Sequence, residues 1–574
     1  MALFNFGFHG KGKNLTVDDR LQIRPSCLQF IAFFTTCWGL GTIVLVDAVN
    51  AVEALAVTTE PSQTPVCVAD LSTVMDQWLQ QPSLRSAIVG VALETMTGEP
   101  IYHFQADRRL IPASNQKLLT TAAALSTWGS DRQWTTPIQL TYTDRGEPEV
   151  WIRGAGDPTI TSASLTQVAA IVAQRLKQRG IDRLAGLVGD DRAFEGSNVP
   201  GSWEVADTQT GYGARINSLI LNENAIPLIL WPQNPGEPLR VEWENPGEAP
   251  NWPVDNFSVT GEPSAAEFVA VGTIAQSQDQ SQEYSHEQSP NALPTVRVEG
   301  VLRTGAAPET VSIALPNPGK HFLLRFQAAL QQQGIRVDHT RLLEDPRFEE
   351  SGESVLSELA PTELAPTETI ATLTSPPLAE LVQVTHYYSQ NLYAEVLLRW
   401  LGQASAGLKP DVSPTGFRPS TFEDGLEYLR QLLQDWGIDP LQVSIADGSG
   451  LSRHNAITPK TIVQVLQFLQ QPERSDLGRI YRSSLSEAGV SGNLATRFQN
   501  TPLQGKLWGK TGSMTGIAAF SGYLYPDRFA PLTFSILINQ SSASYGTLSE
   551  TIDRVLLDWV QLRDCNQQLK AGSA

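Results

Sequence analysis

The chain has 574 residues, of which 41% are hydrophobic and 18% charged, which excludes a disordered protein and predicts several domains with apolar cores. The net charge of −19 at pH 7 argues against nucleic acid and anionic lipid as partners bound through bulk electrostatic attraction.

Residues 1–56 have the pattern of an export segment. Four basic residues precede an apolar run from Cys27 to Val46, and Ala54-Leu55-Ala56 resembles a signal-peptide cleavage site. The run is also long enough to span a bilayer. The segment is therefore either a cleaved signal peptide or a membrane anchor through residues 27–46. Both alternatives predict an exported, periplasmic protein, and the second adds inner-membrane association.

Residues 57–137 are predicted to form the first part of a catalytic domain. The apolar run 88–93, a turn at Thr97-Gly98-Glu99-Pro100 and the strand-like run 101–104 predict a hairpin. An apolar helix then begins near Ser114. Backbone N–H groups and the helix dipole favour negative charge at such an N-terminus.

Residues 138–370 are predicted to be a large inserted region that is composite and mostly β. Strand-like runs recur in it, and a further subdomain is expected at about residues 225–315. Residues 275–290 are rich in Gln and Ser, which predicts a flexible loop. Residues 349–369 hold a tandem Glu-Leu-Ala-Pro-Thr and are interpreted as a linker or long loop.

Residues 371–574 are predicted to complete the catalytic domain. Three strands are expected at 505–511, 516–524 and 532–539, followed by an amphipathic helix at 547–562. Strands from both ends of the chain, with a closing helix, predict one antiparallel sheet flanked by helices. The fold class is therefore α+β.

Two of the four cysteines, Cys67 and Cys565, lie outside the export segment. An exported chain meets an oxidising compartment, where a disulfide is chemically allowed. Helix-like stretches follow the first and precede the second, so the thiols meet if these helices pack antiparallel. A disulfide is the hypothesis, and two unpaired cysteines are the alternative.

Three short motifs carry the chemistry: Ser114-x-x-Lys117, Ser389-x-Asn391 and Lys510-Thr511-Gly512. Each alone is common, and the information lies in their order and context. Together they are the S-x-x-K, S-x-N and K-T-G set of penicillin-reactive serine enzymes. Their spacing places Ser114 and Lys117 on one helix face.

Burial and the nearby positive charge of Lys510 would lower the pKa of Lys117. A neutral Lys117 can then take the proton of the Ser114 nucleophile. Ser389 can pass a proton to a leaving amine, and Asn391 can hold either the substrate amide or Lys117. Which group is the acylation base stays open.

The remaining motif residues suit substrate binding. Lys510 and Thr511 fit a terminal carboxylate, and Gly512 lets a substrate lie against the strand edge. Backbone N–H groups of Ser114 and Ser513 are expected to hold the oxyanion.

From about residue 70 to 560 the chain resembles the D-alanyl-D-alanine carboxypeptidase/endopeptidases among the class C low-molecular-mass penicillin-binding proteins. The resemblance is carried by five segments besides the S-x-N and K-T-G motifs: 109–117, 154–159, 222–225, 375–378 and 447–453. Two positions depart from the family pattern, Ala155 and Tyr388.

The resemblance implies a penicillin-binding-protein/serine β-lactamase-like catalytic domain interrupted by an insertion. It also implies hydrolysis of D-alanyl bonds in peptidoglycan stem peptides and cross-links, covalent inhibition by β-lactams, and no cofactor. An acidic residue of the insertion is expected to bind the amine of a diaminopimelate side chain. Asp190 matches that position, with Asp191 as second choice, and Arg453 is expected to help shape the site.

Two other functions remain as alternatives. A β-lactamase shares the acylation chemistry, but it does not need so long an insertion. A catalytically silent wall-binding scaffold does not need the intact motif residues. A metal peptidase is disfavoured because the chain has no H-E-x-x-H motif and only seven scattered histidines.

Overall fold

A computed structural model of the chain describes residues 65–274, 294–344, 368–406 and 421–565. The predicted export segment, the loop 275–290 and all but the last two residues of the segment 349–369 lie outside the described residues. Among the helices of the described ranges, none combines the length and apolar character needed to cross a membrane.

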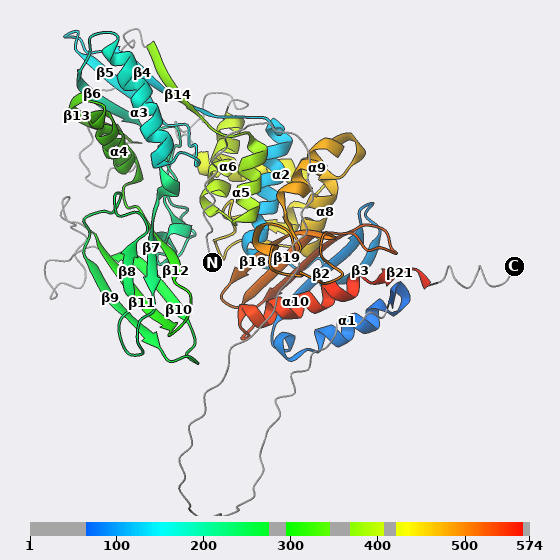
Figure 1. Ribbon diagram of the computed structural model, residues 1–574. Helices are drawn as coiled ribbons and strands as arrows, with labels where there is room; N and C mark the ends of the chain where they lie inside the picture. Colours follow the sequence, from blue (N-terminus) through cyan, green and yellow to red (C-terminus); the bar gives the residue numbers. More distant parts are fainter. Residues whose placement is uncertain (1–64, 275–293, 345–367, 407–420, 566–574) are drawn as a thin grey trace, which may run out of the picture. The chain divides into compact units, whose positions relative to one another are not determined.

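The centre of the catalytic part is a six-stranded antiparallel sheet (Figure 1). Its strand order is β17-β18-β19-β20-β2-β3, so strands from the two ends of the chain lie side by side. The bounds are Ser486–Glu487, Leu507–Met514, Ile517–Leu524, Leu532–Asn539, Ile88–Thr95 and Pro100–Phe104. The predicted sheet of distant segments is confirmed.

The two faces of this sheet bury different cores, as the two-residue period of a strand requires. Phe520, Phe534 and Ile536 pack against the terminal helices α1 (Leu71–Leu79) and α10 (Tyr545–Trp559). Figure 1 shows α10 in red and α1 in blue on this side. The predicted helix 547–562 ends earlier, at Trp559, because Leu562 lies in a short strand.

The opposite face is covered by helices that enclose Tyr523 and Leu537 in the other core. These helices are α2 (Gln116–Trp128), α5 (Leu378–Tyr387), α6 (Asn391–Ala406), α7 (Thr421–Asp435), α8 (Pro459–Leu469) and α9 (Ser475–Ser484). A two-stranded ladder, β15 (Val443–Ser444) with β16 (Ala456–Ile457), joins α7 to α8.

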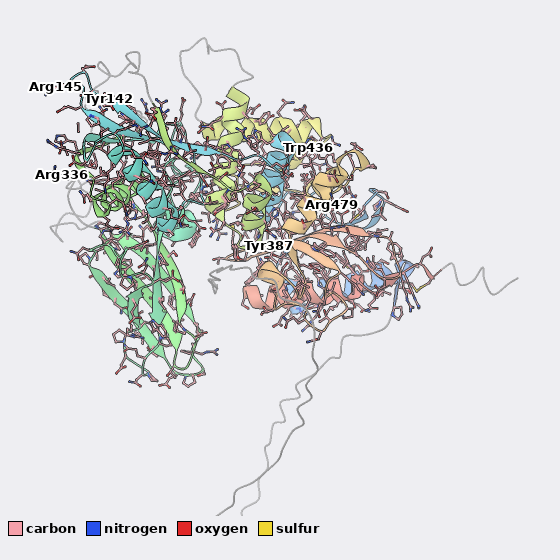
Figure 2. The ribbon with its side chains drawn as sticks, turned by 45° about the horizontal axis from the view of Figure 1, so that its top comes forward. Tyr142, Arg145, Arg336, Tyr387, Trp436 and Arg479 are labelled. Atoms are coloured by element: carbon pink, nitrogen blue, oxygen red, sulfur yellow. A yellow bond between two sulfur atoms is a disulfide. The ribbon has the colours of Figure 1, made fainter. Side chains whose placement is uncertain are left out.

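The inserted region contains a five-stranded mixed sheet in the order β13-β6-β5-β4-β14. Helices α3 (Ser162–Lys177) and α4 (Pro318–Gln332) pack together over its core. The strand bounds are Arg336–Leu343, Arg183–Asp190, Pro148–Arg153, Thr135–Tyr142 and Glu368–Thr374. Strand β4 therefore starts before residue 138, and strand β14 ends after residue 370, the limits expected from the sequence. Figure 2 shows the exposed side chains Tyr142, Arg145 and Arg336 at the ends of its strands.

A further pair of three-stranded sheets lies within residues 225–314, in the orders β12-β7-β8 and β10-β11-β9. A separate apolar core, which includes Leu228, Leu230 and Val298, is buried there. The bounds are Glu309–Ala314, Ala225–Trp231 and Arg240–Trp243 for the first sheet, and Phe268–Ile274, Thr295–Arg303 and Val254–Gly261 for the second.

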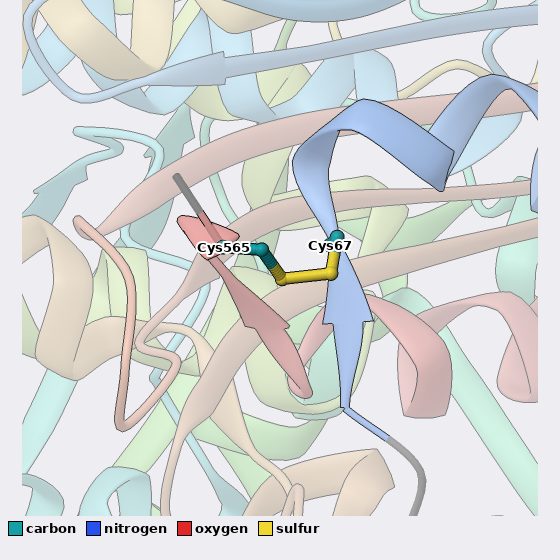
Figure 3. Close-up of a disulfide and its surroundings, with 2 residues drawn as sticks. All are labelled: Cys67 and Cys565. Atoms are coloured by element: carbon teal, nitrogen blue, oxygen red, sulfur yellow. A yellow bond between two sulfur atoms is a disulfide. The ribbon is translucent and has the colours of Figure 1, made fainter. Parts of the chain in front are cut away.

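Cys67 and Cys565 form a disulfide, with their Cα atoms 5.5 Å apart (Figure 3). A short parallel ladder aligns them, because β1 (Val66–Cys67) pairs with β21 (Leu562–Arg563). Strand pairing, in addition to the terminal helices considered from the sequence, thus brings the two ends of the catalytic part together.

Candidate active site

Ser114 lies in a single 3-10 turn, Ala113–Asn115, directly before α2. Ala113 has a left-handed backbone, with φ of 46°. Asn115 Nδ2 donates to Ser521 Oγ of β19 at 2.7 Å, which ties the turn to the central sheet. Ser114 is thus half-buried and held against the sheet, and it lies just before α2, which starts at Gln116.

Lys117 is completely buried on the first turn of α2. Its Nζ lies 3.0 Å from Ser114 Oγ, 2.6 Å from Asn391 Oδ1 and 2.7 Å from the Ser449 carbonyl oxygen. Burial lowers the pKa of Lys117 to about 7, while the negative charges of Asp447 and Glu395 act in the opposite direction.

This geometry suits a neutral amine, which has two N–H groups and one lone pair. The Asn391 and Ser449 carbonyl oxygens can each accept one N–H. The lone pair then faces Ser114 Oγ, whose hydroxyl can donate to it. Lys117 is therefore placed to receive the Ser114 proton.

Ser389 connects the nucleophile to the second lysine. It lies between α5 and α6 with a left-handed backbone, φ 57°. Its Oγ donates to Ser114 Oγ at 2.9 Å and accepts from Lys510 Nζ at 2.9 Å. Four side chains therefore form one continuous line of polar contacts, from Lys117 through Ser114 and Ser389 to Lys510.

Lys510 is held on β18 by the strand ladder, where it pairs with Ser521. Its Nζ also donates to its neighbour's carbonyl oxygen, Thr511 O, at 2.8 Å. Burial and the charge of Lys117 both lower the pKa of Lys510 well below its usual range. Thr511 Oγ1 accepts from Asn493 Nδ2 at 2.7 Å, a contact that the motifs did not predict.

Gly512 lies against the nucleophile turn. A Cβ added to it would come within 2.9 Å of the Pro112 carbonyl oxygen and 3.0 Å of the Ser114 backbone nitrogen. The strand can approach this closely only without a side chain. Ser513 follows Gly512 on β18 and is exposed. The expected oxyanion donors, the backbone N–H groups of Ser114 and Ser513, therefore belong to two segments that adjoin at Gly512.

A buried carboxylate pair that sequence reasoning missed lies under Lys117. Glu395 Oε1 accepts from the backbone N–H groups of Gly448 and Ser449, at 3.0 and 2.8 Å. Asp447 accepts from Gly450 N at 2.7 Å and from Ser452 N at 2.6 Å. These bonds fix the turn that points the Ser449 carbonyl at Lys117. The sequence marks the segment 447–453 only through the family resemblance, and the signal for Glu395 is a glutamate inside an apolar helix.

Asp190 ends β6 and Asp191 follows it, and among the described residues neither shares a hydrogen bond or an ion pair with the four side chains of the line. The two oxygens of Asp190 accept from Arg192 Nε and Nη2 at 2.8 and 3.0 Å. Burial raises the pKa of Asp190, but Arg192 outweighs it and holds the pKa below its usual range.

Asp191 has a structural environment. It is buried and accepts from the backbone N–H groups of Ser218 and Leu219, at 2.7 and 2.8 Å. Burial raises its pKa to about 6 despite these bonds. Because Asp191 is buried and already bonded to nearby backbone N–H groups, it is poorly suited to bind a substrate amine.

Arg453 reaches the far end of β18. Its Nη1 donates to the Thr515 carbonyl oxygen at 3.4 Å, and its Nε lies 3.2 Å from a Glu204 oxygen of the inserted region. It borders the turn after β18 and is not in the line of polar contacts around Ser114. Among the described residues no cluster of three or more His, Cys, Asp or Glu could hold a metal ion.

The chain matches known proteins over most of its length. A model of the D-Ala-D-Ala carboxypeptidase 3 (S13) family matches residues 71–557. The chain belongs to this family. It is 30% identical, over 492 residues, to the D-alanyl-D-alanine carboxypeptidase of Actinomadura sp. (strain R39), covering 83% of this chain and 82% of that protein. It is 24% identical over 440 residues to D-alanyl-D-alanine carboxypeptidase DacB of Haemophilus influenzae, covering 75% of this chain and 80% of that one.

A solved structure supports the fold. The crystal structure of penicillin binding protein 4 (dacB) from Haemophilus influenzae matches with a TM-score of 0.63 at 23% sequence identity, over 83% of this chain and 94% of that one. The predicted α+β, penicillin-binding-protein-like fold and the family resemblance are both confirmed. The chain is a serine-type D-Ala-D-Ala carboxypeptidase by family.

Proposed function

We propose that this protein hydrolyses D-alanyl bonds in peptidoglycan, both at the ends of stem peptides and in cross-links, through an acyl-enzyme on Ser114. The observation that carries the proposal is the unbroken line of contacts from Lys117 through Ser114 and Ser389 to Lys510. It supplies a base, a nucleophile and a proton donor within hydrogen-bond distance of one another.

Acylation follows from these positions. Neutral Lys117 takes the proton as Ser114 Oγ bonds to the carbonyl carbon. Ser389 then gives its proton to the leaving amine nitrogen as the C–N bond breaks, and Lys510 Nζ, 2.9 Å away, can restore it. Water then attacks the ester carbonyl and gives one proton back to Lys510 through Ser389. Lys117 returns its proton to Ser114 Oγ as the ester C–O bond breaks, which releases the peptide acid and restores the Ser114 hydroxyl and neutral Lys117. A β-lactam carbonyl enters the same path, so penicillins are expected to be covalent inhibitors.

Substrate selectivity is assigned to the β18 side and to the insertion. Lys510 and Thr511 are proposed to bind the terminal carboxylate. Asp190 is proposed to meet the amine of a diaminopimelate side chain, for which Arg192 must give way because it occupies both carboxylate oxygens. Asp190→Ala should weaken cleavage of diaminopimelate-containing peptides more than that of simple D-Ala-D-Ala peptides, and an equal loss on both contradicts this role.

Export to the periplasm is part of the proposal. The basic-then-apolar N-terminal sequence supports it, and peptidoglycan lies outside the cytoplasm. A disulfide between Cys67 and Cys565 is consistent with an oxidising compartment. Whether residues 27–46 are removed or remain as an anchor is tested by N-terminal sequencing of the protein from cells.

The test is digestion of purified muropeptides by the wild type and by Ser114→Ala. The wild type should release D-alanine from pentapeptides and convert cross-linked dimers to monomers, and Ser114→Ala should do neither. Unchanged muropeptides with the wild type favour a silent scaffold. Rapid multiple turnover of a chromogenic cephalosporin, in place of a stable adduct, favours a β-lactamase.

A further inference from the structure

The inserted region presents a strained turn to the catalytic part. Asn222, Glu223 and Asn224 are consecutive and all left-handed, with φ of 48°, 57° and 56°. This conformation costs roughly 1–2 kcal/mol per residue for an L-amino acid, and asparagine tolerates it best. Such strain at three adjacent positions directs attention to what the turn holds in place.

The two asparagines fix the flanks of this turn. Asn222 Oδ1 accepts from Ser162 N at 3.0 Å, and Asn224 Nδ2 donates to Asn217 Oδ1 at 2.7 Å. The middle residue is Glu223, whose side chain points away from the turn and reaches Gln390. Its Oε2 accepts from Gln390 Nε2 at 2.7 Å. Burial raises the pKa of Glu223 to about 7, and the bond from Gln390 partly opposes this.

Gln390 is the middle residue of the S-x-N motif. Its neighbours both touch the reacting groups: Ser389 Oγ lies 2.9 Å from Ser114 Oγ, and Asn391 Oδ1 lies 2.6 Å from Lys117 Nζ. Ser389 is itself left-handed, so its loop needs restraint from outside. The insertion supplies a second restraint, because Asn391 Nδ2 donates to the Tyr212 carbonyl oxygen at 2.8 Å.

We infer that Glu223 is a positioning residue for the proton relay. Its carboxylate holds Gln390, and through it the loop that aims Ser389 at Ser114 and Asn391 at Lys117. The inserted region is then a working part of the catalytic centre as well as an accessory domain. This inference rests on the proposed function of Ser114.

The experiment measures the rate constant for acylation by a fluorescent penicillin, separately from non-covalent affinity. Glu223→Ala and Gln390→Ala should each slow acylation by on the order of 10–100-fold, since a misplacement of about 1 Å can cost that much. The double variant should be no slower than either single variant. Glu223→Gln keeps an acceptor oxygen for Gln390 and should acylate within a few-fold of the wild type.

Glu248→Ala is the matched control, because Glu248 Oε2 accepts from Asn222 Nδ2 at 3.0 Å on the same turn without touching Gln390. It should leave the acylation rate unchanged. Should Glu223→Ala fail to fold, Gln390→Ala, which leaves the turn intact, carries the test. Wild-type rates in Glu223→Ala or in Gln390→Ala, or losses that multiply in the double variant, overturn the inference. A wild type that is not acylated at all instead refutes the proposed function.

Discussion

The two lysines of the site lie in opposite walls with different surroundings. The helical wall consists of α2, α6 and the turn 447–452, and it places Glu395 and Asp447 beneath Lys117. The sheet wall is β18, where burial and Lys117 both act on Lys510 in the same direction. Both lysines are completely buried, yet only Lys117 has carboxylates that oppose the cost of its charge.

This difference assigns the lysines different roles. The carboxylates keep the pKa of Lys117 near neutrality, where an amine can both take and return a proton. Lys510 has no such compensation, so a carboxylate that arrives with the substrate would supply the missing negative charge. Lys117 in the helical wall therefore has balancing negative charge before a substrate binds, whereas Lys510 in the sheet wall receives it from the bound substrate.

The largest expected effect is at the centre of the helical wall. Lys117→Ala removes the base and should slow acylation by about 10²–10⁴-fold. Lys117→Arg should lose as much, because a guanidinium stays protonated at any pH used. The measurement is the rate of penicillin labelling. An arginine variant that retains wild-type rates contradicts the role of Lys117 as proton acceptor.

The next effect concerns the sheet wall. Gly512→Ala would place a methyl group 3.0 Å from the Ser114 backbone nitrogen, and so disturb an oxyanion donor. The expected loss in acylation rate is on the order of 10²-fold. Gly201→Ala is the matched control, since a Cβ there meets no atom within 4 Å. Equal rates for the two variants would show that β18 does not need its close approach.

A smaller effect sharpens the comparison between the walls. Burial and Asp447 raise the pKa of Glu395 itself to about 7, and its charged form raises the pKa of Lys117, so Glu395→Gln should lower the pKa of Lys117. Acylation requires neutral Lys117 and increases as pH rises through its pKa of about 7. The acid limb of the pH–rate profile should therefore move to lower pH. Glu427→Gln changes an exposed side chain of α7 and should leave the limb in place. A shift to higher pH in Glu395→Gln contradicts this electrostatic role of Glu395.

The smallest effect on catalysis is expected far from both walls. Cys565→Ser opens the disulfide with Cys67 and should lower the free energy of unfolding by about 2–4 kcal/mol. Because neither cysteine contacts the site residues described above, acylation at 25 °C should stay at the wild-type rate. Denaturant unfolding and labelling of the same preparation measure the two quantities. A loss of labelling by the folded variant would tie the terminal ladder to the site.

The sequence predicted the strands of the sheet wall, and the structure brings the motif residues of the expected site together. The apolar residues of the sequence indicated the strands β18, β19 and β20. Ser114 and Lys117 are three residues apart, so local helical geometry brings them together. Helix boundaries were less accurate, because the end of α10 depends on the ladder between β1 and β21.

Contacts between distant segments were not predictable in the same way. Glu223 meets Gln390, and Glu395 meets the turn at Ser449, only after the chain has folded. The sequence around Glu223 or Glu395 does not indicate which distant residue either carboxylate meets. Asp190 shows the reverse case: the resemblance indicated a substrate contact, and the structure pairs it with Arg192, two residues along the chain.

The most direct test of the account is intact-mass spectrometry after reaction with benzylpenicillin, followed by peptide mapping. We expect the wild type to gain the mass of one whole penicillin molecule, located on the peptide that contains Ser114, and Ser114→Ala to gain none. An unmodified wild type, or an adduct on any other residue, would contradict it.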